Sequence, residues 1–200
     1  MVKTENRESF FRRLEPVLAN RECGDIRRAY RLAKKAHRRQ QRKELDPTGE
    51  PQRYFEHLRR TALILIDEVG IVDRTLVVAA LLHDTLEDSP EVSYTLLRDR
   101  FGKREAGIVR RLSKVPKDGY LERLVRAGWQ TLIVKACDRL DNLRSLDRPG
   151  IARDFVIKQV RETREKYLPV FEVMCAIAPD QWTVQTRLIS DLVVLELIKL

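Results

Sequence analysis

The sequence predicts an all-α protein, and three features of the 200-residue chain support this prediction. Apolar residues recur at spacings of three and four along most of the chain, which is the periodicity of helices with one buried face. Glycine and proline are sparse, at eight each, which suits helices joined by short loops. Segments in which polar and apolar residues alternate, the pattern typical of strands, are few and short.

Ten stretches of the chain carry the helical pattern, and turn-forming residues separate several of them. The stretch ELDPTGEPQR, residues 44–53, contains two prolines and a glycine and is predicted to be a loop. Gly70 should end one helix, and Asp73 should cap the next, whose run LVVAALL is expected to be central and buried. Pro179 divides the last two helices. The predicted helices are 8–20, 24–43, 54–69, 74–84, 93–101, 103–113, 120–127, 129–146, 152–177 and 181–199.

The composition is typical of one folded domain. With 43% hydrophobic and 34% charged residues, the chain differs from disordered sequences and can bury a sizeable core. We expect a single domain over residues 1–200, with its core at about 24–177. The C-terminal helix, 181–200, is amphipathic and is a candidate interface for a homodimer or a protein partner, although packing in the core is the alternative.

Three observations bear on the compartment. The longest unbroken apolar run has seven residues, far fewer than the roughly 20 that cross a bilayer, so no membrane partner is expected. The first 15 residues lack the apolar core of a secretory signal. Cys23, Cys137 and Cys175 are odd in number and widely spaced, which indicates reduced thiols. We therefore expect the protein in the cytoplasm.

The net charge of +9 belongs to the N-terminal segment. Residues 1–43 contain 14 Lys and Arg against 5 Asp and Glu, whereas the remaining 157 residues carry 25 of each sign. Three interpretations are open: a solvated helix face, one wall of a pocket for a highly anionic ligand, or a contact with nucleic acid. No RNA-binding signature or interleaved aromatic residues support the last, so nucleic acid is not an expected partner.

The chain has only three histidines, and one of them, His83, lies beside a cluster of carboxylates. His83 and Asp84 end the apolar run of LVVAALLHDTLED, and Glu87 and Asp88 follow one helical turn later. Burying an imidazole and three carboxylates is costly unless a cation gathers them, which points to a divalent metal. Imidazoles and carboxylates without thiolates suit Mn²⁺, with Fe²⁺ and Zn²⁺ as alternatives. The plainer interpretation is a helix cap followed by solvated acids.

Two further clusters can complete such a site, and each has a plainer explanation. The stretch KACDRLDNLRSL, 135–146, places Asp138 among apolar residues of a predicted helix, where an ion pair with Arg139 or Arg144 is the alternative. The stretch YFEHLRRTALIL sets His57 near the start of a helix with one apolar face. A single histidine there is more often structural than a ligand.

Together these clusters resemble the HD superfamily of metal-dependent phosphohydrolases. Its signature order, H…HD…D, is matched by His57, His83-Asp84 and Asp138. The longer motifs GEPQRYFEH, AALLHDTLED, FGKREAGIVRRLSK and VKACDRLDNLRSL are similar to those of the Rel/SpoT-type alarmone hydrolases. The resemblance covers roughly residues 30–148 and is strongest to the stand-alone small alarmone hydrolases, which lack a synthetase domain. HDxxED is more specific than a bare HD, because most HD phosphodiesterases lack the trailing acidic pair.

The resemblance implies an HD-domain helical bundle, with an added N-terminal basic helix and C-terminal helices. It also implies four ligands of one metal ion, usually Mn²⁺: His57, His83, Asp84 and Asp138. Glu87 and Asp88 are expected to activate or orient the attacking water, as a carboxylate general base would.

The resemblance assigns substrate contacts as well. Arg42 is expected to contact the guanine, and Asn142 the sugar–phosphate part of a nucleotide. Lys114 matches a lysine of the family's TK motif, with serine in place of the threonine. Lys43 and Arg139, like Arg42, carry the positive charge that would offset a pyrophosphate.

The implied reaction is hydrolytic removal of the 3′-pyrophosphate of ppGpp or pppGpp, which gives GDP or GTP. One alternative is an HD phosphohydrolase for another nucleotide, such as an adenine alarmone, a deoxynucleotide or NADPH. The other is a non-catalytic HD module that regulates a partner. A degenerate module should have lost ligands, and all four are present, which favours the enzyme.

The sequence departs from the family pattern at three places. Leu58 stands where a proline usually follows the first ligand histidine, and the loop between Arg42 and His57 is longer than is common. Asp141 replaces the histidine of the DRLHN element. These changes leave the metal set untouched and concern the choice of nucleotide.

Overall fold

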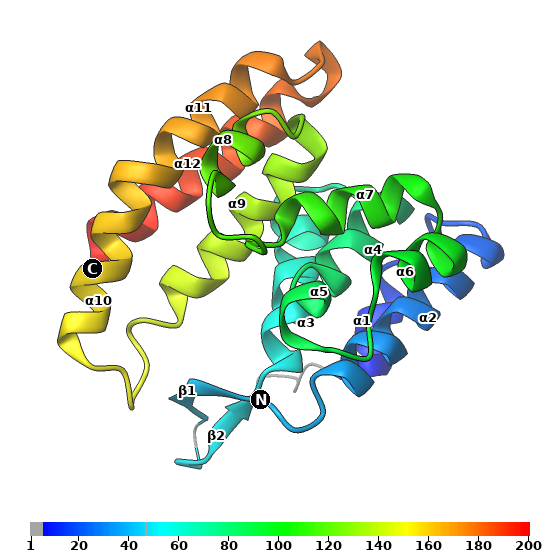
Figure 1. The fold of residues 1–200 in the computed structure, drawn as a ribbon, viewed down its shortest axis with the longest axis horizontal. Helices are drawn as coiled ribbons and strands as arrows, with labels where there is room; N and C mark the ends of the chain where they lie inside the picture. Colours follow the sequence, from blue (N-terminus) through cyan, green and yellow to red (C-terminus); the bar gives the residue numbers. More distant parts are fainter. Residues whose placement is uncertain (1–5, 47) are drawn as a thin grey trace.

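The computed structural model describes residues 6–46 and 48–200 and confirms the all-α prediction (Figure 1). The α-helices are α1 Arg7–Arg12, α2 Asn20–Ala36, α3 Phe55–Leu63, α4 Arg74–Leu82, α5 Thr85–Asp88, α6 Tyr94–Phe101, α7 Lys103–Leu112, α8 Tyr120–Val125, α9 Trp129–Arg144, α10 Arg153–Glu162, α11 Leu168–Ile177 and α12 Thr183–Lys199. Two π-helical turns, η1 Ile64–Glu68 and η2 Thr163–Tyr167, continue α3 and α10, and a short 3₁₀ turn, η3 Asp180–Trp182, precedes α12. A small hairpin joins β1 Gln41–Leu45 to β2 Pro51–Arg53.

Helix α4 lies at the centre of the N-terminal half, as its apolar sequence predicts. The side chain of Asp73 accepts a hydrogen bond from the backbone N–H of Leu76 at 2.9 Å and so caps the helix. Every residue from Thr75 to Leu82 is buried, because α4 packs against α2, α3, α7 and α9. A helix that is packed on all sides can be apolar around its whole circumference. The polar residues His83 and Asp84 follow at its C-terminal end.

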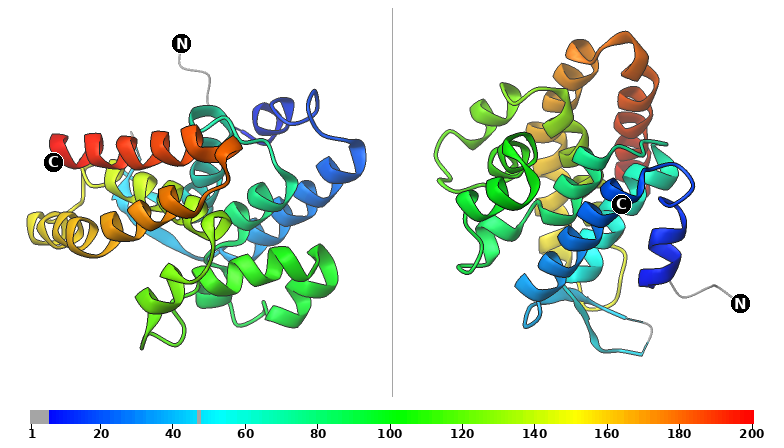
Figure 2. Two further views of the ribbon diagram at one scale, coloured as in Figure 1. Left: turned by 90° about the horizontal axis from the view of Figure 1, so that it is seen from above. Right: turned by 90° about the vertical axis from the view of Figure 1, so that its right-hand side faces the viewer.

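Helix α9 connects this core to the C-terminal helices. It packs against α3 on one side and against α11 and α12 on the other. Figure 2 shows α11 and α12 running antiparallel, side by side. Ile189 and Val193 of α12 are buried in this contact, whereas Val184 and Ile198 are more than 70% exposed. One face of the last helix thus packs in the core, and another face exposes apolar side chains to solvent.

Two helix predictions near the N-terminus are wrong. The predicted helix 8–20 ends at Arg12, and turns follow. Pro16 lies within that stretch, and a proline inside a helix has no N–H to donate and collides with the preceding turn. The predicted helix 24–43 ends at Ala36, because residues 41–45 form strand β1.

The hairpin is held by contacts that are distant in sequence. Strand β1 pairs antiparallel with β2, with Gln41 opposite Arg53. The hairpin therefore replaces the end of the predicted helix 24–43 and most of the predicted loop 44–53. The backbone N–H of Leu45 donates to the carbonyl oxygen of Pro149 at 3.0 Å, which ties β1 to the segment after α9. In the described ranges, no helix is both long and apolar enough to cross a bilayer.

Candidate metal centre and the adjoining cavities

Three helices far apart in sequence bring four potential metal ligands together. His57 lies in the first turn of α3, and Asp138 lies in the middle of α9. His83 and Asp84 occupy the turn between α4 and α5, where the chain leaves the helix and projects both side chains from its end. Both histidines and Asp138 are at most 3% exposed. The site therefore lies where α3, α4 and α9 meet.

The candidate ligand atoms lie close to one another, and each carboxylate lies near both histidines. The Nε2 atoms of His57 and His83 are 3.3 Å apart. Asp138 Oδ1 lies 3.1 Å from His57 Nε2 and 3.6 Å from His83 Nε2. Asp84 Oδ2 lies 3.1 Å from His83 Nε2 and 3.7 Å from His57 Nε2.

These separations fit a shared divalent ion. Ligand atoms about 2.1 Å from one ion, at tetrahedral or octahedral angles, lie about 3.0–3.4 Å from one another. Three of the five separations fall in this range, and the other two, 3.6 and 3.7 Å, are longer. Two imidazole nitrogens and two carboxylate oxygens form a donor set that suits Mn²⁺, Fe²⁺ or Zn²⁺. The cluster of His57, His83 and Asp138 can therefore hold a metal ion, and Asp84, whose Oδ2 lies 3.1 Å from His83 Nε2, is a fourth candidate ligand beside it.

Hydrogen bonds orient both imidazoles for this role. His83 Nδ1 lies 2.8 Å from the carbonyl oxygen of Ala80, one turn earlier in α4. A carbonyl oxygen can only accept, so Nδ1 donates a proton to it, and Nε2 is the nitrogen that could bind an ion after losing its own proton. His57 Nδ1 lies 2.6 Å from Asp141 Oδ2, and the same argument leaves its Nε2 free. A hydrogen bond from the outer nitrogen to a fixed acceptor is typical of metal-binding histidines.

The carboxylates make the centre strongly negative. Burial alone would lower the pKa of His83, but Asp84 and Asp138 outweigh it and raise that pKa to about 10. The same negative potential that attracts a proton to His83 attracts a divalent cation. Burial works against ionised Asp84 as well, yet its partner His83 holds the pKa of Asp84 well below the ordinary range.

Asp138 also contacts a buried cation. Lys135 lies one turn earlier in α9, is 3% exposed, and its Nζ lies 2.6 Å from Asp138 Oδ2. Burial opposes the charge on this lysine, but Asp138 raises its pKa well above the usual value. The alternative partners of Asp138 are excluded by geometry, because Arg139 donates to Gln159 and Arg144 donates to Glu68.

A chain of buried and partly buried contacts runs from one candidate ligand to another by way of the hairpin. Behind His57, Asp141 accepts from Arg60 at 2.6 Å, and Arg60 also donates to Glu44 of β1 at 3.2 Å. Glu44 accepts from Arg42 at 3.0 Å. From there the chain returns to the metal centre, because Arg42 donates to Asn142 Oδ1 at 3.0 Å and Asn142 donates to Asp138 Oδ1 at 2.6 Å. We call this series the hairpin relay; its members are His57, Asp141, Arg60, Glu44, Arg42, Asn142 and Asp138.

The acidic pair after the HD motif lies on the wall of the same site. Helix α5 is a single turn, so Glu87 and Asp88 follow a break in the helix and do not continue α4. Both are half-buried. Burial raises the pKa of Glu87 and of Asp88, and the charge of Asp84 raises both further. A carboxylate with a raised pKa accepts a proton more readily than an exposed one.

Two cavities beside the metal centre share part of their lining. The first, of about 220 Å³, opens over the ligands and is bordered by the acidic pair together with Lys114 and Arg139. The second, of about 260 Å³, lies beside the hairpin, is largely apolar, and includes Arg42 and Lys43. Tyr54, Asn142 and Gln159 border both cavities. A ligand that filled both would extend from the ligand cluster to β1.

Comparison with known proteins identifies the family. The model of the HD domain matches residues 29–171 of the chain. The chain belongs to the HD-domain family. Within the family, it is 36% identical over 170 residues to a guanosine-3′,5′-bis(diphosphate) 3′-pyrophosphohydrolase of Aquifex aeolicus, a match that covers 78% of this chain and 23% of that protein. It thus spans about a quarter of the length of that larger relative.

Two further HD-domain relatives are closer to this chain in size. A human guanosine-3′,5′-bis(diphosphate) 3′-pyrophosphohydrolase is 36% identical over 137 residues, which cover 64% of this chain and 72% of that protein. A solved structure described as a metazoan ortholog of SpoT that hydrolyses ppGpp has a TM-score of 0.64 and 24% identity. That match covers 82% of this chain and 93% of the other, and it supports the HD-domain fold.

The HD-domain structure places the predicted site residues in one region of the molecule. The residues predicted as ligands, as acidic pair and as substrate contacts all border one of the two cavities or the metal centre: His57, His83, Asp84, Asp138, Glu87, Asp88, Arg42, Lys43, Lys114, Arg139 and Asn142. Arg42 reaches the site from strand β1, however, and not from the end of a basic helix as the sequence suggested.

Sequence reasoning missed several residues that the fold adds to the site. Tyr54 donates to Asp84 Oδ2 at 2.8 Å, and Gln159 comes from α10, beyond the motifs. Neither has a distinctive sequence signal. Asp141 was visible in the sequence as a departure from the family pattern, but its contact with His57 was not. The aromatic residue three places before a candidate ligand was the one usable hint for Tyr54.

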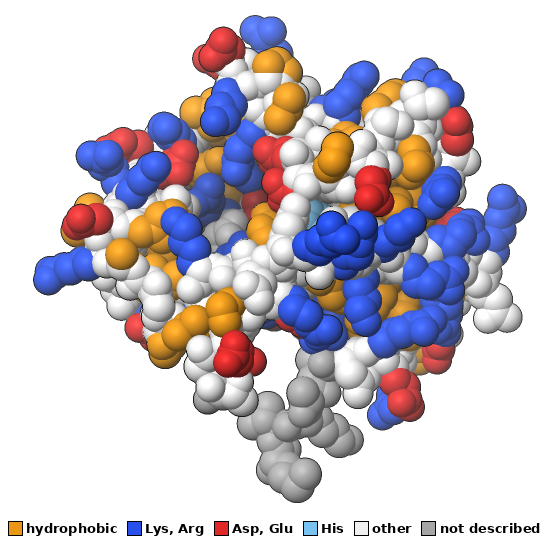
Figure 3. Space-filling model, turned by 60° about the horizontal axis from the view of Figure 1, so that its bottom comes forward, with side chains coloured by type: hydrophobic (Ala, Val, Ile, Leu, Met, Phe, Trp, Pro, Cys, Tyr) orange, Lys and Arg blue, Asp and Glu red, His pale blue; other side chains and the backbone are white. Residues whose placement is uncertain are grey.

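The basic N-terminal segment contributes less to this site than one interpretation of its charge predicted. Among its described basic residues, only Arg42 and Lys43 border the two cavities. Figure 3 shows many Lys and Arg side chains gathered on the side of the molecule where α2 lies in Figure 1. A pocket wall made by the basic helix itself is therefore not found at the metal centre.

Proposed function

We propose that this HD-domain chain hydrolyses the 3′-pyrophosphate of the guanosine alarmones ppGpp and pppGpp, giving GDP or GTP and pyrophosphate. The observation that carries the proposal is the meeting of the two cavities at Tyr54, Asn142 and Gln159. One cavity suits an apolar ring and the other suits phosphates beside a metal. The names of the Aquifex and human relatives support guanosine-3′,5′-bis(diphosphate) as the substrate.

The apolar cavity has the properties of a nucleobase site. The Nζ of Lys43 lies 4.1 Å from the ring centre of Phe155, and the guanidinium of Arg42 lies 5.7 Å from the ring centre of Tyr54. Leu146 and Ile151 add apolar surface. A planar guanidinium can stack on a purine and also donate to its oxygens, which lysine cannot do equally well. We assign Arg42 to the guanine and Asn142 to the sugar–phosphate part.

The four-ligand cluster would hold one divalent ion, for which we propose Mn²⁺, with Fe²⁺ and Zn²⁺ as alternatives. Such an ion supplies two things when bound: a pKa near 7 for a coordinated water and positive charge for the phosphate oxygens. His57, His83, Asp84 and Asp138 hold it through the atoms that converge at 3.1–3.7 Å.

The side chains around the ion would perform the remaining chemistry. Glu87 or Asp88 accepts a proton from the attacking water, a role that the raised pKa of each supports. The water oxygen bonds to the phosphorus that is attached to the ribose 3′ oxygen. The bond between that phosphorus and the 3′ oxygen breaks. The 3′ oxygen takes up a proton, so the nucleotide leaves as GDP or GTP. Lys114 and Arg139 would offset the charge of the departing pyrophosphate.

A panel of nucleotides tests this assignment. The purified chain, supplied with Mn²⁺, is incubated separately with ppGpp, pppGpp, an adenine alarmone, deoxynucleoside triphosphates and NADPH, and the products are separated by chromatography. We expect GDP or GTP together with pyrophosphate. Release of single phosphates, or faster turnover of a deoxynucleotide or NADPH, would favour the more general phosphohydrolase. The absence of turnover with every nucleotide would favour a regulatory module.

We also propose that a second copy of this chain binds through α12 to form a homodimer. The exposed side chains Val184, Leu195 and Ile198 on α12 give the C-terminal helix an outward apolar face, which supports an interface there. Sedimentation at several protein concentrations would detect such a homodimer, and Leu195→Asp should return it to a monomer.

A further inference from the structure

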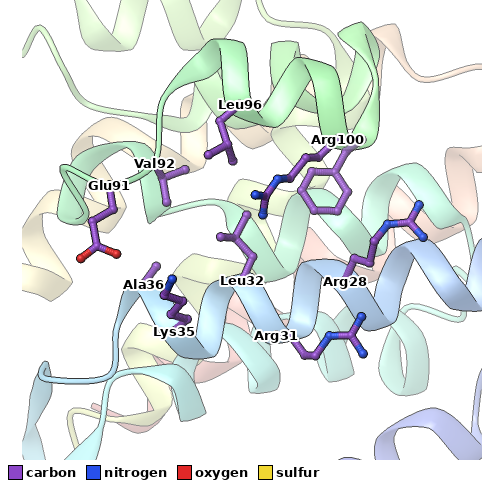
Figure 4. Close-up of a pocket in the computed structure, with 10 residues that line it drawn as sticks. Arg28, Arg31, Leu32, Lys35, Ala36, Glu91, Val92, Leu96 and Arg100 are labelled. Atoms are coloured by element: carbon purple, nitrogen blue, oxygen red, sulfur yellow. The ribbon is translucent and has the colours of Figure 1, made fainter.

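A third cavity, remote from the metal centre, lies between α2 and the segment from Glu91 to Phe101. Its volume is about 440 Å³, within the range of small-molecule sites. Figure 4 shows Arg100 extending from α6 into the space above α2, and Lys35 at the edge of the facing helix. We call it the α2–α6 cavity; its charged border consists of Arg28, Arg31, Lys35, Glu91 and Arg100.

Most of the positive charge around this cavity is unneutralised. Arg31, Lys35 and Arg100 are exposed and form no ion pair with any residue of the described ranges. Arg28 pairs with Asp25 on its own helix, and the single acid on the border, Glu91, is 3.3 Å from Arg38. Like charges held close together repel, and a bound anion relieves that repulsion.

The floor of the cavity is apolar. Leu32 and Leu96 point toward each other in Figure 4, and the buried side chains of Val92 and Phe101 add to the apolar lining. A free inorganic anion would not use this surface. The combination of an apolar floor with several cations on one border fits a ligand that has a flat apolar part and closely spaced negative charges. Acidic peptides spread their carboxylates along a chain, whereas a diphosphate or triphosphate concentrates its charge.

We propose that the α2–α6 cavity is a second ligand site, which binds a nucleoside polyphosphate with its base on the Leu32–Leu96 floor and its phosphates among Arg31, Lys35 and Arg100. The site is distinct from the two cavities at the metal centre, with which it shares no lining residue. The proposal does not rest on the reaction assigned above, because binding is measured without turnover.

A short segment connects this site to the acidic pair. Val92 lines the cavity, and its backbone N–H donates to the carbonyl oxygen of Ser89 at 3.1 Å. The carbonyl oxygen of Asp88 accepts from the side chain of Gln40 at 2.8 Å, which fixes the other end of the segment to the chain that follows α2. A ligand between α2 and Val92 therefore restrains residues 88–92, and with them the position of Asp88.

Calorimetric titration of the metal-loaded chain with ATP tests the proposal. The test variant is Arg31→Gln/Arg100→Gln, and the matched control is Lys34→Gln/Arg39→Gln, which removes two exposed cations that do not line the cavity. We expect the test variant to bind ATP at this site at least tenfold more weakly than the wild type and the control, because charge-assisted hydrogen bonds to phosphate are lost. Hydrogen exchange of residues 88–97 should slow with ATP in the wild type and the control, but not in the test variant.

Basal ppGpp hydrolysis without ATP should be equal in all three proteins, which shows that the variants fold and that the site is separate. Equal ATP affinity in the two double variants would overturn the proposal. Pyrophosphate binding as tightly as ATP would overturn the role of the apolar floor. A single-stranded RNA that bound more tightly than ATP, and lost affinity equally in both double variants, would make this a nucleic-acid face and also overturn it.

Discussion

Asp141 is the residue whose role changes most once its surroundings are known. It is 2% exposed and contacts both His57 Nδ1 and Arg60, so it holds the imidazole with Nε2 toward the candidate metal site. Asp141→Leu should lower the affinity for Mn²⁺ about 10- to 100-fold, the usual effect of removing a partner behind a metal-binding histidine. Asp141→Asn, which keeps an acceptor oxygen, should lie between that variant and the wild type.

Metal titration followed by competition with a chelator measures these affinities. Asp147→Asn is the control, since Asp147 is exposed and close in sequence. If Asp141→Leu bound Mn²⁺ as tightly as the control, Asp141 would not position the ligand. The sequence could not reveal this contact, because residues 57 and 141 meet only where α3 crosses α9. The four proposed ligands could be predicted, because the spacing of their motifs is specific.

Variants of Glu87 and Asp88 test the proposed proton transfer separately from metal binding. Glu87→Gln/Asp88→Asn removes both candidate proton acceptors and none of the four ligands. We expect the double variant to keep its Mn²⁺ and to lose about 10²-fold or more in kcat. Elemental analysis measures the bound Mn²⁺, and single-turnover experiments measure the rate of the chemical step. A rate near that of the wild type would place the base elsewhere.

Variants of Arg42 test whether this side chain recognises the nucleobase of the substrate. It is held between Glu44 and Asn142, so its guanidinium has a fixed position beside the apolar cavity. Arg42→Lys should raise KM for ppGpp several-fold with a smaller change in kcat, the pattern expected when binding is lost equally from substrate and transition state. Arg39→Ala should leave KM unchanged, because Arg39 is exposed and borders neither cavity. If Arg39→Ala and Arg42→Ala changed KM equally, Arg42 would contribute only positive charge and would not contact the base.

At the scale of elements, the β1–β2 hairpin lines the cavity that we propose for the nucleobase, and it depends on the loop after α9. Gly150 has φ +90°, and a Cβ there would lie 3.0 Å from the carbonyl oxygen of Lys43. Gly49 has φ +87° with open space around it. Alanine at either position should cost about 1 kcal/mol of stability from backbone strain alone.

Only Gly150→Ala should also displace β1, and therefore only this variant should raise KM for ppGpp. Thermal unfolding and steady-state kinetics of both alanine variants separate the two effects. Equal KM values in Gly49→Ala and Gly150→Ala would mean that the 149–150 segment does not position β1.

The hairpin is also where prediction from sequence failed at this scale. The strand QRKEL consists of residues that favour helices, and it follows a basic helix without a glycine or proline to mark the change. Its pairing with β2 and with Pro149 overrides that preference. Helix α4 was predictable for the opposite reason. Asp73 and the run LVVAALL specify its start and its burial locally, and the packing agrees with both.

At the scale of the whole molecule, the candidate metal centre joins α3, α4 and α9, so an ion there would stabilise the entire fold. An ion that binds only the native state adds about 4 kcal/mol at a free concentration 1,000 times its Kd. For a chain of this length, that corresponds to roughly 8–16 °C in Tm. We expect Mn²⁺ to raise Tm of the chelator-treated wild type by that amount and to leave Tm of His83→Ala unchanged. A similar rise in both proteins would assign the ion to another site.

The hairpin relay closes on itself, since it leaves the metal centre at His57 and returns at Asp138 after passing through Arg42. Any ligand that fixes Arg42 therefore acts on two of the groups that surround the ion. Free energies of binding at two coupled sites are reciprocal. If Mn²⁺ tightens the binding of GDP by some factor, GDP must tighten the binding of Mn²⁺ by the same factor. The cell's nucleotide level would then help to decide how much of this protein carries its metal.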